Sequence, residues 1–153
     1  MRIGIVGGCG HIGLPLSLLI AKNHKTTIID TSSKNIELVK KNKPPFQEEL
    51  INLYLKKKYL KKNLDFCNDI KKISNNKYDA IIIAIGTPVD EWGNPETETL
   101  KNICITSSKI LKKSGTLILR STVTPGFSIN LKKKISKKIK IFYCPERIAQ
   151  GKS

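Results

Sequence analysis

Three glycines near the start of the chain have the spacing of a pyrophosphate-binding loop. Gly8, Gly10 and Gly13 form the pattern G-x-G-x-x-G directly after the apolar run at residues 2–7. In such a loop the first glycine permits a tight turn, the second lets the backbone approach the phosphates, and the third lets the next helix pack closely on the strand. The helix N-terminus adds free N–H groups and a partial positive charge. The pattern alone would also fit a simple glycine-rich turn, so its context decides between the two.

Asp30 provides that context. It ends the second apolar run, TTIID at residues 26–30, and follows Gly13 by 17 residues. A carboxylate at this position accepts hydrogen bonds from a ribose 2′-hydroxyl and repels a 2′-phosphate. No arginine lies nearby in the sequence to reverse that choice, although Lys34 is close. The sequence therefore predicts NAD rather than NADP as the cofactor. Asp30 could also serve as an acid at the N-terminus of the next helix, and the two roles are compatible.

The remaining residues of the glycine loop are given simpler roles. His11 and Ile12 fall in the first turn of the expected helix. His11 could be read as catalytic, but a histidine in a phosphate loop more often contributes its backbone N–H, which is the role we expect. Cys9 is interpreted as a small loop residue without a redox function.

Polar residues also follow the later apolar runs. The stretches GTPVDEWGNPET (86–97), RSTVTPG (120–126) and CPERIAQGKS (144–153) each come after a segment that reads as a strand. Ligands of parallel α/β sheets bind beyond the carboxyl ends of the strands. The hydroxyls of Ser121 and Thr122 are therefore expected at the same edge of the sheet as the glycine loop.

The elements that must position these residues alternate between short apolar runs and longer helical patterns. The pattern predicts strands at residues 2–7, 26–30, 64–68, 78–86, 115–122 and 139–144, and helices at 11–23, 35–42, 47–60, 97–113 and 127–138. Ser32 or Ser33 is suited to cap the second helix. Such alternation indicates an α/β fold with a doubly wound parallel six-stranded sheet, an NAD-binding Rossmann fold in strand order 3-2-1-4-5-6. We expect one domain that spans residues 1–153.

Composition narrows the possible partners. The formal charge is +16, but it comes from 25 Lys against only 3 Arg. Because proteins that read phosphates and base edges favour arginine, the excess indicates a solvated lysine surface, and no nucleic-acid partner is predicted. The four Cys show no CxxC spacing, so no metal site is predicted. Neither a signal peptide nor an apolar run of about 20 residues is present, which predicts a cytoplasmic protein with reduced thiols and no membrane partner.

Four motifs in register resemble one family. They are GCGHIGLPLS (8–17), GTPVDEWGNPET, RSTVTPG and YCPERIAQGKS (143–153), each at an expected strand end. Together they resemble the N-terminal NAD-binding domain of the UDP-glucose/GDP-mannose dehydrogenase family over essentially the whole chain. The CPER form is similar to the branch that oxidises UDP-N-acetyl-hexosamines such as UDP-N-acetyl-D-mannosamine.

The resemblance implies an oxidoreductase of polysaccharide biosynthesis. Such enzymes combine an NAD domain, a central helical domain and a C-terminal nucleotide-sugar domain, and they oxidise the sugar C6 alcohol to a carboxylate in two NAD-dependent steps. By position, the His11–Ile12 backbone would contact the pyrophosphate and Asp30 the adenosine ribose. Thr87 and Thr122 would line the nicotinamide half of the site.

The resemblance also assigns residues to the reaction. Glu146 would be the catalytic-site acid, assisted by Thr122, while Arg147 and Ile148 would contact the substrate. Some relatives carry a second acid where this chain has Gln150, and an amide cannot act as a base. The branch varies at this position, so we treat the difference as mild.

The nucleophilic cysteine of the family is the larger departure, because it is expected in a segment beyond residue 153. None of the four Cys here has the matching context; Cys144 is nearest, but it reads as a small residue closing a buried strand. Without a thiolate the second oxidation has no thiohemiacetal to pass through. We therefore expect a chain truncated before the catalytic cysteine, lacking the central and C-terminal domains and inactive alone.

Two other interpretations remain open at this point. The chain could be a free-standing NAD-binding module without catalysis, since fold alone does not decide function. A different Rossmann dehydrogenase, of the hydroxyacid or 6-phosphogluconate type, would have to treat the CPER motif as a coincidence. A UDP-sugar is an expected partner only if the missing domains complete the site, and no oligomeric state is predicted.

Overall fold

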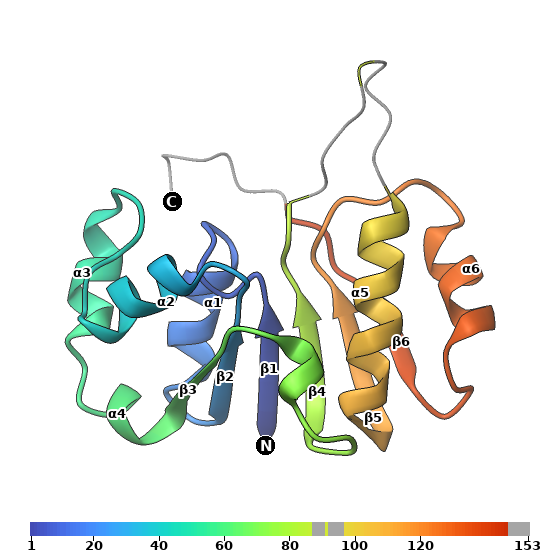
Figure 1. The fold of residues 1–153 in the computed structure, drawn as a ribbon, viewed down its shortest axis with the longest axis horizontal. Coiled ribbons are helices and arrows are strands. Elements are labelled where there is room, and N and C mark those ends of the chain that lie inside the picture. The colour runs from blue at the N-terminus through green and yellow to red at the C-terminus, as the bar shows by residue number, and fades with distance from the viewer. Residues whose placement is uncertain (87–90, 92–96, 147–153) are drawn as a thin grey trace.

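The computed structural model describes residues 1–86, Glu91 and residues 97–146. Six parallel strands form one sheet, and their arrows point to the same edge (Figure 1). The strands are β1 (Arg2–Val6), β2 (Lys25–Ile29), β3 (Leu64–Cys67), β4 (Tyr78–Ile83), β5 (Leu111–Leu119) and β6 (Lys140–Tyr143). Their order in the sheet is β3-β2-β1-β4-β5-β6, so the predicted doubly wound topology is confirmed.

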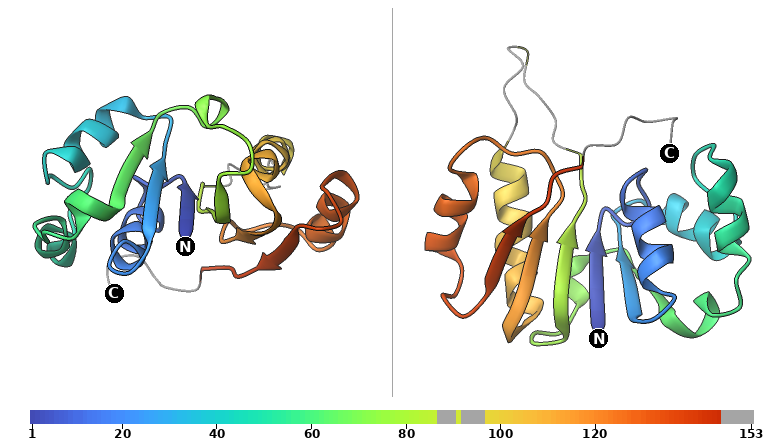
Figure 2. Two further views of the ribbon diagram at one scale, coloured as in Figure 1. Left: turned by 90° about the horizontal axis from the view of Figure 1, so that it is seen from below. Right: turned by 180° about the vertical axis from the view of Figure 1, so that it is seen from behind.

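Helices cover both faces of this sheet (Figure 2). They are α1 (Gly13–Ile20), α2 (Ser33–Lys40), α3 (Glu49–Leu55), α4 (Leu60–Asn63), α5 (Thr97–Ile110) and α6 (Phe127–Lys134), with a 3₁₀ turn, η1, at Ile70–Lys72. Figure 2 shows α1 on one face, over β1 and β2, and α5 on the other, over β4 and β5. Because apolar residues of β1 and β4 are buried towards both faces, these strands read as continuous apolar runs in the sequence.

The buried apolar residues form clusters on both sides of the sheet. Leu14 and Leu18 of α1 pack with Ile28 of β2 and with buried residues of α2, α3 and α4. Leu100 and Cys104 of α5 pack on the other side, against residues of β4, β5 and α6. Both layers fix the strand ends, and therefore the loops that follow them.

The helix predicted at 47–60 is two helices. Leu55 and Leu60 are both buried, but a separation of five residues would point them to different faces of one continuous helix. The turn through residues 56–59 allows both leucines to enter the same core, while Lys56, Lys57 and Lys58 stay exposed.

The fifth strand begins earlier than predicted. Helix α5 ends at Ile110, and Leu111 is already paired with Tyr78 of β4. The register then shifts, and Lys112 to Ser114 are exposed before Thr116 pairs with Ala80. Lys112 stays at this bulge because its Nζ forms an ion pair of 2.6 Å with Oδ1 of Asp79.

The sixth strand is the exposed edge of the sheet, which corrects the expectation of a buried strand closed by Cys144. Phe142 and Tyr143 are exposed, and so is Cys144. Cys144 nevertheless extends the pairing of β6 with β5, because its N–H donates to Leu119 O at 2.8 Å.

Candidate functional site

The glycine loop makes a tight turn at the carboxyl end of β1. Gly7 has a φ of +78°, and its N–H donates to Ile29 O at 2.9 Å. Gly10 N–H donates back to Gly7 O at 3.1 Å. The left-handed residue of the turn is thus Gly7, one position before the predicted Gly8. A Cβ at Gly8 would lie 2.9 Å from Ile5 O, so this glycine is needed for close packing instead.

Gly13 brings α1 against the loop, as predicted. A Cβ there would lie only 2.1 Å from Gly7 O. At Gly10, by contrast, a Cβ would have one neighbour within 4 Å among the described residues, Gly7 O at 3.3 Å, so the described residues leave this side of the loop open. Within the described part of the chain, no backbone hydrogen bond uses the N–H groups of His11 and Ile12. The loop therefore offers free donors beside an open space, an arrangement that fits a pyrophosphate.

The His11 side chain points to a residue that sequence reasoning missed. Its ring stacks on Phe46, with centroids 3.9 Å apart and an interplanar angle of 29°. Phe46 belongs to the KPPF segment at residues 43–46, between the helices predicted at 35–42 and 47–60, and no role was predicted for it from the sequence. The stack occupies the imidazole face, which is consistent with a backbone role for His11 in the loop.

Asp30 ties the glycine loop to the start of α2. Its Oδ2 accepts from Cys9 N–H at 2.9 Å, and its Oδ1 accepts from Ser32 N–H at 3.0 Å. Ser32 in turn caps α2, because its Oγ accepts from Asn35 N–H at 3.2 Å. A carboxylate oxygen can accept two hydrogen bonds, so Asp30 keeps acceptor capacity for a ribose while it holds the helix cap. The geometry shows Asp30 at the start of α2 and is compatible with the ribose role, which stays a prediction.

The charge of Asp30 also affects Cys9. Burial, and then the nearby Asp30 carboxylate, raise the pKa of the Cys9 thiol to about 12. A thiol that stays protonated is a poor nucleophile. Cys9 is therefore a buried packing residue of the loop, as the sequence indicated.

A cavity of about 380 Å³ lies beyond the ends of β1, β2, β3 and β4, beside the glycine loop and Asp30. Its walls combine apolar groups with a few polar ones: Val6, Gly7, Gly10, Ile29, Asp30, Thr31, Asn35, Asn68, Asp69, Ile70, Ala84, Ile85, Gly86 and Ile103. An apolar-lined cavity that also contains carboxylate acceptors for ribose hydroxyls suits an adenosine. The cavity spans the β1–β4 boundary, where the strand order reverses and such folds bind nucleotides.

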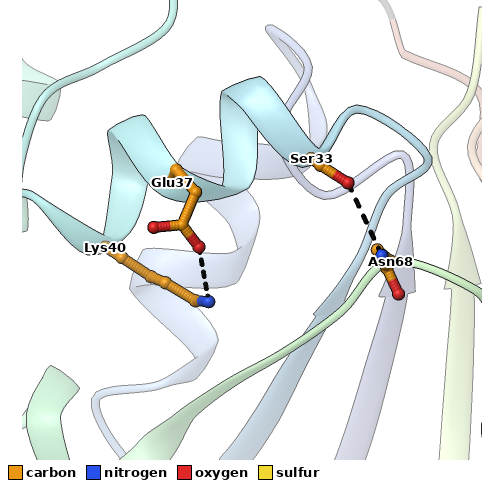
Figure 3. Close-up of polar contacts among 4 residues, drawn as sticks. All are labelled: Ser33, Glu37, Lys40 and Asn68. Carbon is orange, nitrogen blue, oxygen red and sulfur yellow. Dashed lines mark hydrogen bonds and ion pairs between the residues drawn. The ribbon is translucent and has the colours of Figure 1, made fainter.

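Asn68 and Asp69 form a wall of this cavity that sequence reasoning did not assign. The Asn68 side chain makes a long contact of 3.5 Å with Oγ of Ser33 at the start of α2 (Figure 3). Asp69 turns the chain after β3, where its Oδ1 accepts from Lys71 N–H at 2.9 Å. The strand predicted at residues 64–68 could have located this wall. Its carboxyl end lies at the same edge of the sheet as the ends of the first two strands, so the residues that follow it are expected at the cavity.

The hydroxyls after β5 have different roles. Ser121 is buried, and its Oγ donates to Ile85 O at 2.7 Å, so it binds the end of β5 to the end of β4. Thr122 is exposed at the same edge, where a ligand can reach it. Thr87, the other residue expected near the nicotinamide, lies outside the described residues.

Glu146 lies against β5. Its Oε2 accepts a hydrogen bond from Nη2 of Arg120, the residue directly before Ser121. Both side chains are largely buried, with 26% of Arg120 and 20% of Glu146 exposed. Arg120 was not singled out from the sequence, although it is one of three arginines in the chain. The expected substrate contacts Arg147 and Ile148, together with Gln150, lie outside the described residues.

The remaining cysteines are not arranged as a catalytic or metal centre. Burial raises the pKa of Cys104, inside α5, to about 12. Cys67 donates its S–H to Asp69 O at 3.2 Å. Among the residues that the structure describes, no group of three His, Cys, Asp or Glu side chains could hold a metal ion. No helix in the same residues is long and apolar enough to cross a membrane.

Comparison with known proteins assigns the chain to a family. Residues 1–153 match the UDP-glucose/GDP-mannose dehydrogenase family, NAD binding domain. NAD, the cofactor predicted from the glycine loop and Asp30, is therefore confirmed, and the interpretation as a hydroxyacid or 6-phosphogluconate dehydrogenase is not supported.

Individual relatives agree with the family match. A UDP-glucose 6-dehydrogenase of Streptococcus pneumoniae is 27% identical over 100% of this chain and 38% of its own length. A UDP-N-acetyl-D-mannosamine dehydrogenase of Methanococcus maripaludis is 27% identical over 95% of this chain and 34% of its own. The crystal structure of a GDP-mannose dehydrogenase from Pseudomonas aeruginosa superposes with a TM-score of 0.82 and 26% identity, over 97% of this chain and 37% of that one. The chain thus spans about a third of the length of these relatives.

Proposed function

Because the chain belongs to the UDP-glucose/GDP-mannose dehydrogenase family, we propose that it is the NAD-binding part of a nucleotide-sugar 6-dehydrogenase. The observation that carries this proposal is the arrangement of Asp30. One carboxylate holds the phosphate loop through Cys9 N–H and the α2 cap through Ser32 N–H, and it also faces the cavity at the switch point. NAD supplies the hydride acceptor when bound, and these residues bind and orient its adenosine half.

The reaction we propose is oxidation of the C6 alcohol of a nucleotide sugar to a carboxylate. The CPER motif at residues 144–147 favours a UDP-N-acetyl-hexosamine over UDP-glucose or GDP-mannose. In this reaction Thr122 lines the nicotinamide side and Glu146 accepts protons, directly or through a water. Arg147 and Ile148 contact the substrate.

We further propose that these 153 residues do not turn over a substrate by themselves. The second oxidation in this family runs through a thiol adduct, and a nucleophilic cysteine needs an accessible thiolate. Cys9 and Cys104 are buried with pKa values raised to about 12. Cys67 is bonded to Asp69 O, and the exposed Cys144 follows an edge strand away from the cavity walls described above.

A chimera tests the proposal. Residues 1–153 would replace the NAD domain of the Methanococcus maripaludis relative, whose remaining domains supply the nucleophile. We expect NADH formation with UDP-N-acetyl-D-mannosamine from the chimera and none from residues 1–153 alone. A chimera carrying Glu146→Gln serves as the matched control and should lose most of the activity. A chimera that folds and binds NAD but forms no NADH would support the alternative, a binding module without catalysis.

A further inference from the structure

We propose that Arg120 is a positioning residue that keeps Glu146 ionised and aimed at the carboxyl edge of the sheet. The inference deepens the proposed function, because it assigns the charge state of the acid on which that function depends. It starts from one contact, the hydrogen bond from Nη2 of Arg120 to Oε2 of Glu146. These residues are 26 positions apart in the sequence.

The backbone of Arg120 is held in place by a hydrogen bond to the end of β4. Its backbone N–H donates to Ile83 O at 2.8 Å, across the last residues of β4 and β5. The next residue, Ser121, is buried and donates its hydroxyl to Ile85 O at 2.7 Å. The guanidinium therefore starts from a fixed point at the sheet edge. Glu146 follows the end of β6 by three residues, on a segment joined to β5 through the bond from Cys144 N–H to Leu119 O.

The guanidinium has an unused donor on the same side. Nε of Arg120 is buried and makes no hydrogen bond in the described part of the chain. A buried donor without a partner is costly and calls for an explanation. Nε and Nη2 together form the side-on fork of an arginine, which matches the two oxygens of a carboxylate. Arg120 therefore presents to this edge of the sheet the pair of donors that suits a carboxylate, and one of them already binds Glu146.

The burial of the pair makes its charges effective. Only 26% and 20% of the two side chains are exposed, so solvent and salt screen them less than the surface pair of Lys40 and Glu37, at 46% and 56%. The charged group that faces Glu146 from the end of β5 is Arg120. On the segment of Glu146 itself, the sequence places Arg147 directly after it and the titratable Tyr143 and Cys144 shortly before it. An adjacent guanidinium favours the ionised form of a carboxyl group.

The charge state determines what Glu146 can do. Oxidation of an alcohol to an aldehyde releases one hydride, which NAD accepts, and one hydroxyl proton, which needs a base. An ionised Glu146 can take that proton but cannot donate one. Arg120 therefore selects the base role for this acid, whereas a carboxyl group in an apolar pocket would stay protonated.

The test needs neither cofactor nor substrate, so it is independent of the proposed function. Residues 1–153 are labelled with ¹³C at the glutamate carboxyl carbons, and their signals are followed by NMR as the pH is lowered. Glu146→Gln identifies the Glu146 signal by its loss. We expect the Glu146 midpoint to lie below the ordinary glutamate value of about 4.3, and to rise by about one pH unit in Arg120→Met, since an opposite charge at hydrogen-bond distance shifts titration by one to three units. Arg120→Lys should restore part of the difference.

Control variants distinguish a specific effect of Arg120 on the titration of Glu146 from a general effect of removing a positive charge. Lys40→Met removes the surface partner of Glu37 (Figure 3) and should change the Glu37 signal but not that of Glu146. An unchanged Glu146 midpoint in a folded Arg120→Met variant would overturn the proposal. If that variant does not fold, the wild-type chain still decides, because a Glu146 midpoint at or above the ordinary glutamate value would overturn it as well. In the chimera, Arg120→Met should lower kcat and move the acidic limb of the pH–rate profile upward, with little change in the KM for NAD.

Discussion

The carboxylate of Asp30 accepts a hydrogen bond of 2.9 Å from the backbone N–H of Cys9, in the middle of the glycine loop. The residue that we propose to select the cofactor ribose therefore also holds the glycine loop. In the proposed NAD site, the ribose contact and the position of the phosphate loop would both depend on this one side chain at the end of β2.

Asp30→Asn should reduce the ratio of the affinity for NAD to the affinity for NADP. Cys9 and Ser32 donate to different oxygens of the carboxylate, and the amide places an NH2 group at one of them, so one of the two bonds is lost; the neutral amide also no longer repels a 2′-phosphate. We expect NAD affinity to fall at least tenfold, about 1.4 kcal/mol, and NADP affinity to fall less. Calorimetric titration of both cofactors measures this. Asp65→Asn, an equal charge change at an exposed β3 residue outside the cavity walls, should leave the ratio unaltered.

Gly13→Ala should destabilise the fold. A methyl group at this position would lie 2.1 Å from Gly7 O, and neither backbone can move without disturbing the turn. Overpacking of this kind costs about 1–3 kcal/mol, or a fall of several degrees in Tm. Gly86→Ala is the matched control, because a Cβ there meets no atom of the described residues within 4 Å. Equal melting curves for the two variants, measured by circular dichroism, would disprove the close packing.

The fold could be predicted well from the sequence because each strand and most helices carry a local pattern. The continuous apolar runs of β1 and β4 and the glycine loop determine the order of the sheet. Helix boundaries were predicted less well, because tertiary packing sets them: the break between α3 and α4 exists to bury both Leu55 and Leu60. The edge strand β6 was wrongly predicted to be buried. Its sequence, KIFY, has three apolar residues in a row, as an interior strand does.

The parts of the site that consist of a local sequence motif with a fixed spacing, the glycine loop and Asp30, could be predicted from the sequence. It was not predictable where residues distant in the sequence meet. Arg120 and Glu146 come from different strand ends, and the stack of His11 on Phe46 joins two loops 35 residues apart. No local pattern encodes such contacts, because they depend on how the crossovers bring the strand ends together.

The cysteine thiols of the folded chain should react with a thiol reagent at very different rates. Cys9 and Cys104, with pKa values raised to about 12, should not react with a thiol reagent at about pH 8. The exposed Cys144 should react first. Titration with a chromogenic disulfide gives the number and the rates, and Cys144→Ser should remove the fast phase. Rapid reaction of Cys9 before unfolding would refute its interpretation as a buried loop residue.

Asp79 should contribute stability that depends on pH. Hydrogen bonds from Lys112 Nζ and then from Arg2 N–H hold its pKa below the ordinary value of 3.8. A carboxyl group of this kind stabilises the fold above its unfolded pKa and loses that effect as the pH falls through the folded pKa. The free energy of unfolding of Asp79→Asn should be lower by up to about 1 kcal/mol at pH 6, and the difference should shrink below about pH 4. Urea denaturation of both proteins at several pH values tests this, and a difference that grows in acid would contradict it.

Calorimetric titration of the wild-type chain with NAD and with NADP tests the central claim most directly. If the glycine loop and Asp30 form the cofactor site, NAD should bind to one site per chain, and NADP should bind at least tenfold more weakly because its 2′-phosphate meets the Asp30 carboxylate. Equal affinities for the two cofactors, or no binding of NAD by the folded chain, would contradict the account.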